Sequence, residues 1–304
     1  MKTLLDDRYR ASSTSPFQLP DQTRMSQVRL RTLNLAPVLG FYQDIIGFKY
    51  SQRNEAEVSL SATGGGPALL VFTEDPNATP RPQRTTGLYH FAIRYPTRGD
   101  LADASRRIIG AEYPISGAAD HGVAESIHLT DVDGNGVELY CDRPRSQWPM
   151  RRGRLQNVTR PLNFDSLLAA VGGGPIPASI PEQTDIGHIN LHVADLVAAE
   201  EFFHNFLGLE VMARAGDSAT FLATGGYHHH VAVNTWAGKT PAPKNALGLI
   251  SYRLEIPDAL ILAEVLKRAD WFGHEARMDG PILQVRDPNG CWLELTAGQP
   301  QQPV

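Results

Sequence analysis

Cysteine is scarce in this chain, and long apolar runs are missing. The two cysteines, Cys141 and Cys291, are too few for a disulfide framework and suit a reducing compartment, so we expect a cytoplasmic protein. No apolar stretch approaches the roughly 20 residues that span a bilayer. The first residues carry early acids and no signal-peptide core, so neither membrane insertion nor export is expected.

An excess of positive charge is also lacking. The formal net charge is −5 and the pI is about 6.1, which gives no electrostatic reason to expect nucleic acid as a partner. The one basic run, residues 143–154, is interpreted as a solvated linker. With 42% hydrophobic and 20% charged residues in a chain of 304, the composition is typical of globular protein with room for two domains.

What the chain does contain is an internal repeat. Residues 26–47 align with residues 187–208, and residues 87–96 (GLYHFAIRYP) align with residues 248–257 (GLISYRLEIP), both at an offset of 161. Residues 131–139 (DVDGNGVEL) align with residues 287–295 (DPNGCWLEL) at an offset of 156. A fold that is copied keeps its apolar pattern in both copies, whereas a functional site need survive only once.

Each copy contains two units of strand, helix and three strands. In the first unit, alternation at 28–32 predicts a strand, and apolar spacing at 35–46 predicts a helix that ends at Gly47. Four such βαβββ units predict an α+β fold of two half-barrels. We place an N-terminal arm at 1–24, domains at 25–145 and 185–297, a linker at 146–184 and a tail at 298–304.

The ionisable residues do not follow the repeat. His188 aligns with Gln27, and His90 aligns with Ser251, so one histidine remains at a unit start in each half. The carboxylates Glu138 and Glu294 occur in both halves. A buried glutamate is costly without a cation, which makes these positions informative about chemistry.

This pattern of units, with histidine at unit starts and glutamate on closing strands, resembles the vicinal oxygen chelate superfamily. The segments GLYHFAIRYP (87–96), DVDGNGVELYCDRPR (131–145), IGHINLHVADL (186–196) and GGYHHHVAVNTW (225–236) are similar to its bacterial catechol 2,3-dioxygenase group. The resemblance covers about residues 25–297. It implies a half-barrel built from two units, with a divalent metal held by two histidines and a glutamate.

The resemblance leaves open which units pair. If each half closes on itself, both ligand sets are incomplete. If the second unit pairs with the third, His90, Glu138 and His188 form a complete triad, and we favour this arrangement. Two imidazoles and a carboxylate suit Fe(II), with Mn(II) as the alternative. Glu294 would then be a relic or an edge-strand residue.

Further histidines gather in the second and third units. The triplet at 228–230 has no histidine counterpart in the first unit, and strand alternation would turn His229 away from its neighbours. The resemblance places His229 beside the dioxygen site. It also places a tyrosine ten residues before the ligand glutamate, where this chain has His128. Histidine works as an acid or base near neutral pH, so His128 or His121 would handle the substrate proton.

Three functions follow as hypotheses. The preferred one is an Fe(II)-dependent extradiol dioxygenase that cleaves a catechol-type aromatic diol with dioxygen. The second keeps the metal but performs glyoxalase-like isomerisation or thiol transfer. The third is a metal-free protein that sequesters a ligand. The sequence does not define substrate-binding residues or the ring substituents, and it is compatible with a homo-oligomer. A single core histidine such as His90 is ordinarily just hydrogen-bonded, so only the histidines and the glutamate taken together indicate a metal site.

Overall fold

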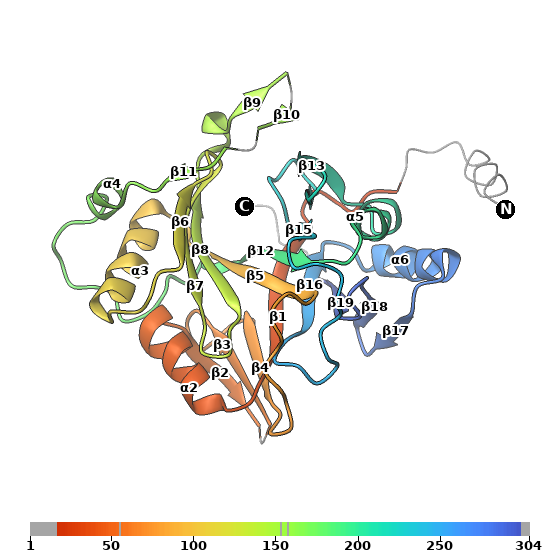
Figure 1. Ribbon diagram of the computed structural model, residues 1–304, viewed down its shortest axis with the longest axis horizontal. Helices are drawn as coiled ribbons and strands as arrows, with labels where there is room; N and C mark the ends of the chain where they lie inside the picture. Colours follow the sequence, from red (N-terminus) through yellow and green to blue (C-terminus); the bar gives the residue numbers. More distant parts are fainter. Residues whose placement is uncertain (1–16, 55, 153, 157, 299–304) are drawn as a thin grey trace.

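The computed structural model describes residues 17–298 except 55, 153 and 157. The expected arm at 1–24 is therefore described only from residue 17, and most of the expected tail lies outside the described residues. Two curled, mixed sheets dominate the fold, with few helices on their flanks (Figure 1). The predicted α+β class with two half-barrels is confirmed.

The first two units have the predicted order, with one unexpected feature in the first helix. It begins as α2 at its cap Asn34, whose side chain accepts from Ala36 N, and continues as a π-helical segment η1 to Gly47. Gly47 has a φ of 103°, a value that favours glycine. The elements are β1 (Arg24–Thr32), α2 (Leu35–Leu39), η1 (Gly40–Ile46), β2 (Lys49–Arg53), β3 (Glu57–Ser61), β4 (Leu70–Glu74), β5 (Gly87–Arg94), α3 (Arg98–Gly110), β6 (Gly117–Asp120), β7 (Ala124–Thr130) and β8 (Gly136–Asp142).

The last two units repeat this order, including the π-helical segment after the first helix. The elements are β12 (Asp185–His192), α5 (Leu196–Glu200), η3 (Glu201–Phe206), β13 (Glu210–Ala215), β14 (Ala219–Ala223), β15 (Val231–Asn234), β16 (Gly248–Ile256), α6 (Ala259–Phe272), β17 (Ala276–Asp279), β18 (Ile282–Arg286) and β19 (Trp292–Ala297). Recurrence of an irregular helix at the same place in both halves supports the internal duplication.

Each sheet takes strands from both halves of the chain. The eight-stranded sheet runs β17-β18-β19-β16-β1-β4-β3-β2 and joins the first and fourth units through antiparallel β1 and β16. The nine-stranded sheet runs β11-β6-β7-β8-β5-β12-β15-β14-β13 and joins the second and third units through antiparallel β5 and β12. The cross-half pairing favoured from the histidines is therefore present. The domain limits at 25–145 and 185–297 remain a proposal.

The helices pack within each half while the strands pair across halves. Helix α3 contacts η1 on one flank, and α6 contacts η3 on the other (Figure 1). The two halves of the chain are therefore interlocked, because each sheet needs strands from both of them. Apolar side chains from both sheets and from the helices form one large core cluster.

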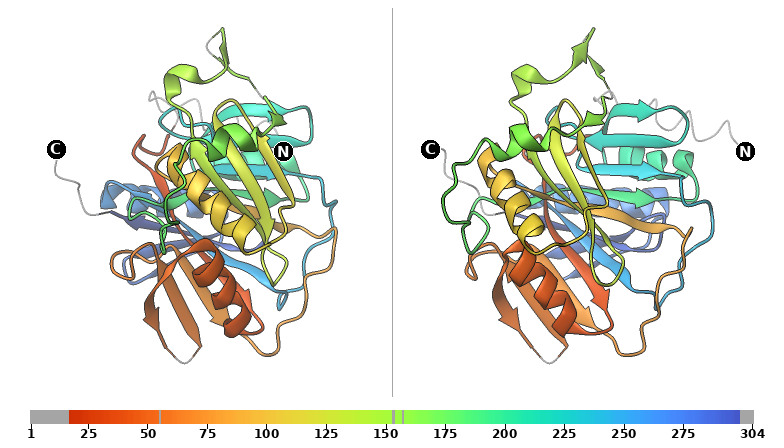
Figure 2. Two further views of the ribbon diagram at one scale, coloured as in Figure 1. Left: turned by 90° about the vertical axis from the view of Figure 1, so that its left-hand side faces the viewer. Right: turned by 60° about the vertical axis from the view of Figure 1, so that its left-hand side comes forward.

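The connector after β8 is more structured than its sequence suggested. It contains η2 (Arg145–Gln147), a hairpin of β9 (Met150–Arg151) and β10 (Arg154–Leu155), β11 (Arg160–Pro161) and α4 (Phe164–Leu168). The hairpin projects beyond the sheets in both side views (Figure 2), and β11 pairs with β6. Within the described part of the chain, no helix is long and apolar enough to cross a membrane.

Candidate metal centre and its cavity

The three residues of the predicted triad lie on one face of the nine-stranded sheet. In the strand register, Ala92 of β5 lies opposite His188 of β12 and opposite Glu138 of β8. His90 lies two residues from Ala92 and so shares its face. The small side chain of Ala92 leaves room for the larger ones around it. Strand pairing thus brings together side chains that are 48 and 98 residues from His90 in the sequence.

The donor atoms of these residues form a small triangle. Glu138 Oε2 lies 3.0 Å from His90 Nε2 and 3.0 Å from His188 Nε2, and the two Nε2 atoms are 3.3 Å apart. Donor atoms about 2.1 Å from a metal and at right angles to one another are about 3.0 Å apart. The triangle therefore fits one face of an octahedral ion, the two-histidine, one-carboxylate set typical of non-haem Fe(II).

The protonation states of the triad also suit a cation. Burial lowers the pKa of His188 to about 4 even though Glu138 pulls it upward. Burial by itself raises the pKa of Glu138, but His188 and His90 outweigh this and lower it well below its usual value. At neutral pH the site thus offers a carboxylate and a neutral imidazole, which are the forms that bind metal.

A cavity of about 400 Å³ opens in front of the triad. His90 and Glu138 line it, and so do three further predicted residues, His121, His128 and His229. Its other walls are mostly apolar or aromatic, and they include a part of the connector: Tyr89, Val123, Leu155, Val158, Thr159, Ala213, Ala215, Phe221 and Trp236. The connector therefore does more than join the halves, because it closes one side of this cavity.

His128 and His121 lie on the second-unit side of the cavity. The ring of His128 is 5.6 Å from that of His90, and its Nε2 lies 3.2 Å from Ser126 Oγ. Burial lowers the pKa of His128, so its imidazole is neutral and able to accept a proton. His121 is 6.5 Å from His128, ring to ring, and its Nδ1 lies 3.2 Å from Thr159 Oγ1.

The alternation expected for the histidine triplet is wrong. Residues 228–230 form an irregular segment before β15 rather than part of the strand, so they do not point to opposite faces in turn. The ring centroids of His229 and His188 are 4.1 Å apart, and His228 reaches within 5.9 Å of the same ring. Two neighbouring histidines thus approach the triad from the same side.

Several residues of this region were missed from the sequence. His228 Nε2 lies 2.9 Å from Asp142 Oδ1, and the hydroxyls of Tyr140 and Tyr227 lie 2.7 Å apart behind it. The signal for Asp142 was available: the position 156 residues later is Gly298, so the carboxylate does not belong to the repeated pattern. The connector residues Leu155 and Val158 carry no comparable signal.

The corresponding place in the eight-stranded sheet is filled by an ion pair. Gln27, Ser251 and Glu294 occupy the positions of the triad there, and Arg253 donates from Nε and Nη2 to Glu294 Oε2 at 3.0 and 2.6 Å. The guanidinium supplies the positive charge that buried Glu294 requires. The alternative of an edge-strand residue is wrong, because β19 lies between β18 and β16.

Replacing Gly187 by alanine should destabilise the fold at the triad. A Cβ at this position would lie 1.7 Å from the Tyr140 hydroxyl, and Tyr140 is fully buried. We expect a loss of about 1–3 kcal/mol in the free energy of unfolding, measured by urea titration. Gly110→Ala, where a Cβ meets nothing within 4 Å, is the control and should not destabilise. Equal stability of Gly187→Ala and wild type would contradict this packing argument.

Comparison with known proteins identifies the family. The sequence model of the family described as the Glyoxalase/Bleomycin resistance protein/Dioxygenase superfamily matches residues 24–139. The catechol-2,3-dioxygenase of Bacillus subtilis (strain 168) is 39% identical over 280 residues, which cover 90% of this chain and 97% of that protein. The chain therefore belongs to this superfamily, as predicted. The predicted enzyme class, an extradiol dioxygenase, is confirmed as well.

Solved structures support the fold. A protein from Bacillus subtilis subsp. subtilis str. 168 matches with a TM-score of 0.64 and 12% identity, over 93% of this chain and 86% of its own. Glyoxalase I from Zea mays matches with a TM-score of 0.55 and 18% identity, over 91% of this chain and 92% of its own. At these identities the likeness concerns the fold alone.

Proposed function

We propose that the chain is an Fe(II)-dependent extradiol dioxygenase for catechol-type aromatic diols, with His90, Glu138 and His188 as the metal ligands. The observation that carries the proposal is the triangle of donor atoms, 3.0–3.3 Å on each side, at the wall of an aromatic-lined cavity. The name of the 39% identical relative, a catechol-2,3-dioxygenase, points to the same reaction. Mn(II) accepts the same ligands and is the alternative metal.

When bound, Fe(II) would supply a centre at which the diol and dioxygen meet and exchange electron density. The remaining chemistry belongs to side chains. His128 or His121 accepts a proton from a substrate hydroxyl and returns it later, as neutral imidazoles can. His229, which lines the cavity beside the triad, accepts a proton from the second hydroxyl of the diol at its free ring nitrogen and passes it to the oxygen that dioxygen contributes. The apolar walls keep bulk water from the reacting groups.

The cavity also indicates the class of diol. A cavity of about 150 Å³ already holds benzene, whereas this one measures about 400 Å³, so there is room for a ring substituent. Among the described residues that line it there is no lysine or arginine. A carboxylate on the substrate would lack a permanent cationic partner there. We therefore propose uncharged alkyl- or aryl-substituted catechols as preferred substrates.

The test is anaerobic reconstitution with Fe(II), followed by addition of catechol and air. We expect the absorbance of a yellow ring-fission product, and no comparable colour with Mn(II) if iron is the working metal. A panel of 4-methylcatechol and 3,4-dihydroxyphenylacetate should favour the uncharged diol in kcat/KM. A preparation with one iron per chain that gives no colour with any diol would sink the proposal.

The same experiment separates the alternatives. Glyoxalase-like sites commonly use a second carboxylate where this chain has His188, and activity on a thiol adduct without ring cleavage would favour that chemistry. A ligand-sequestering role would show as diol binding with no turnover. Cytoplasmic location, the absence of a nucleic-acid partner and assembly into a homo-oligomer stay predictions.

A further inference from the structure

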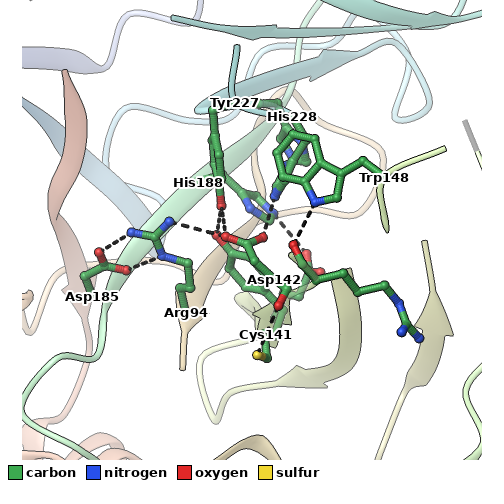
Figure 3. Close-up of polar contacts among 12 residues, drawn as sticks. Arg94, Cys141, Asp142, Trp148, Asp185, His188, Tyr227 and His228 are labelled. Atoms are coloured by element: carbon green, nitrogen blue, oxygen red, sulfur yellow. Dashed lines mark hydrogen bonds and ion pairs between the residues drawn. The ribbon is translucent and has the colours of Figure 1, made fainter. Parts of the chain in front are cut away.

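Two ionisable residues next to His229, namely His228 and Asp142, have no role in the proposed reaction so far. His228 is 3% exposed and contacts His229 through their Nδ1 atoms, which are 2.8 Å apart. Its other ring nitrogen, Nε2, lies 2.9 Å from Asp142 Oδ1 (Figure 3). Asp142, His228 and His229 thus form a continuous hydrogen-bonded chain that begins at the end of β8 and ends at the cavity.

The carboxylate at the start of this chain is fixed in orientation. Its second oxygen, Oδ2, accepts from the Tyr227 hydroxyl at 3.0 Å and lies 3.3 Å from Arg94 Nη1. Arg94 is itself held by two bonds to Asp185, of 2.9 and 2.6 Å (Figure 3). Because Oδ2 is occupied by donors, Oδ1 is left facing His228. The ring of Tyr227 also packs against His228, with centroids 4.0 Å apart.

Chemistry gives the chain a direction. A carboxylate only accepts hydrogen bonds, so Nε2 of His228 carries a hydrogen. With this single hydrogen on its ring, His228 accepts at Nδ1, and the contact with His229 then requires a hydrogen on His229 Nδ1. The other ring nitrogen of His229, Nε2, then carries no hydrogen and makes no contact with His228. The bond also limits rotation of the His229 ring, whose centroid lies 4.1 Å from that of His188.

The fold itself does not need this chain of residues. In the first and fourth units, the equivalent positions are Pro67 for His228, Ala68 for His229 and Gly298 for Asp142. The eight-stranded sheet forms without them. Asp142 and His228 therefore occur in the one sheet that also has the complete triad, which indicates a role in the chemistry of that sheet.

We propose that Asp142 and His228 are positioning residues for His229: they set the ring nitrogen that carries its hydrogen and hold the other nitrogen toward the cavity. This inference rests on the proposed function, since it assigns a task within the ring-cleavage reaction. It concerns residues outside the proposed ligand triad: His228 lines the cavity beside His229, and Asp142 contacts His228 from the end of β8. It predicts that their loss slows turnover without loss of metal.

Asp142→Asn is the decisive variant. Arg94 has only donors, so it should hold the amide oxygen, and the amide nitrogen should then donate to His228 Nε2. This reverses both hydrogen bonds and moves the His229 hydrogen from Nδ1 to Nε2. We expect kcat for catechol to fall about 10- to 100-fold, as is usual when an outer partner of a site is lost. Iron content and the KM for catechol should stay at their wild-type values.

His228→Phe is the second variant. It keeps a flat ring against Tyr227 and removes both nitrogens, so it should lower kcat to a similar extent. Asp103→Asn is the control, because Asp103 also accepts from an arginine, Arg106, but lies on helix α3 and takes no part in the contacts of Arg94, Asp142 and His228. Its kcat should remain near that of the wild type. The positions of the imidazole hydrogens are measured by ¹⁵N–¹H NMR spectra of the protein loaded with diamagnetic Zn(II).

The outcomes separate cleanly. A lower kcat with full iron, an unchanged KM and a relocated His229 hydrogen supports the proposal. Wild-type kcat in His228→Phe overturns it, and so does iron loss in step with activity, which would make His228 a ligand. If the wild type itself cleaves no diol, the proposed function fails. The spectra then still decide the hydrogen-bonded chain, because a hydrogen on His229 Nε2 in the wild type would overturn it.

Discussion

Replacing Glu138 by glutamine should abolish iron binding and ring cleavage, whereas the same change at Glu294 should leave both intact. The two glutamates are 5% and 4% exposed and occupy equivalent strands. Only Glu138 has two imidazole nitrogens at 3.0 Å. Loss of a direct ligand should weaken iron binding by more than the roughly 10- to 100-fold that loss of an outer partner costs. Iron per chain and the rate of yellow-product formation are the measurements.

Glu294→Gln should affect stability instead. Its carboxylate accepts two hydrogen bonds from Arg253, and a neutral amide would leave that guanidinium with a weaker partner. We expect a loss of about 1.5–3 kcal/mol in the free energy of unfolding. Iron loss in Glu294→Gln, or full iron and full activity in Glu138→Gln, would show that the assignment of the two sheets is wrong.

Replacing His229 by alanine should lower kcat by about 10²- to 10⁴-fold, the usual contribution of a positioned acid or base. Iron content should not change, because the triad's three donor atoms come from other residues. The KM for the diol should also change little if His229 serves the dioxygen side. Steady-state kinetics with separately varied diol and oxygen would measure both effects.

His204→Ala is the control for this variant. His204 is an exposed histidine whose Nδ1 contacts the Leu209 carbonyl, and it lies outside the proposed site. Its kcat should match that of the wild type. A small effect of His229→Ala, comparable to that of His204→Ala, would remove the acid role from His229 and place the proton donor on the other side of the cavity.

Much of the architecture could be predicted because the duplicated halves show the same apolar pattern, so each half supports the assignment made for the other. The pairing of the second and third units followed from unequal histidines at equal positions, namely His90 against Ser251 and His188 against Gln27. Local sequence pattern and structure part where tertiary contacts override local preference. The first of the three strands after α3, β6 (Gly117–Asp120), has no β-branched residue, so its position could not be assigned from the sequence; it forms by pairing with β7.

The errors in the site have the same origin. Residues 228–230 do not follow the period of a strand, because they precede β15 and are held by side-chain contacts such as that of His228 with Asp142. The role of Glu294 depends on Arg253, which is 41 residues away and adjoins it only through the parallel pairing of β16 and β19. No local pattern contains such a partner.

The interlocked strand order has a consequence for synthesis of the protein. A nascent chain that has reached residue 145 contains β5 and β8 but lacks β12, and so it has one edge of the nine-stranded sheet unpaired. Strand β1 remains without its antiparallel partner for longer, because β16 begins only at Gly248. Unpaired edges of this kind attract other chains, and late, distant pairing slows folding. The first half of the chain therefore exposes unpaired strands until the second half is synthesised. Expression of the two halves as separate fragments is expected to yield aggregate rather than two folded domains.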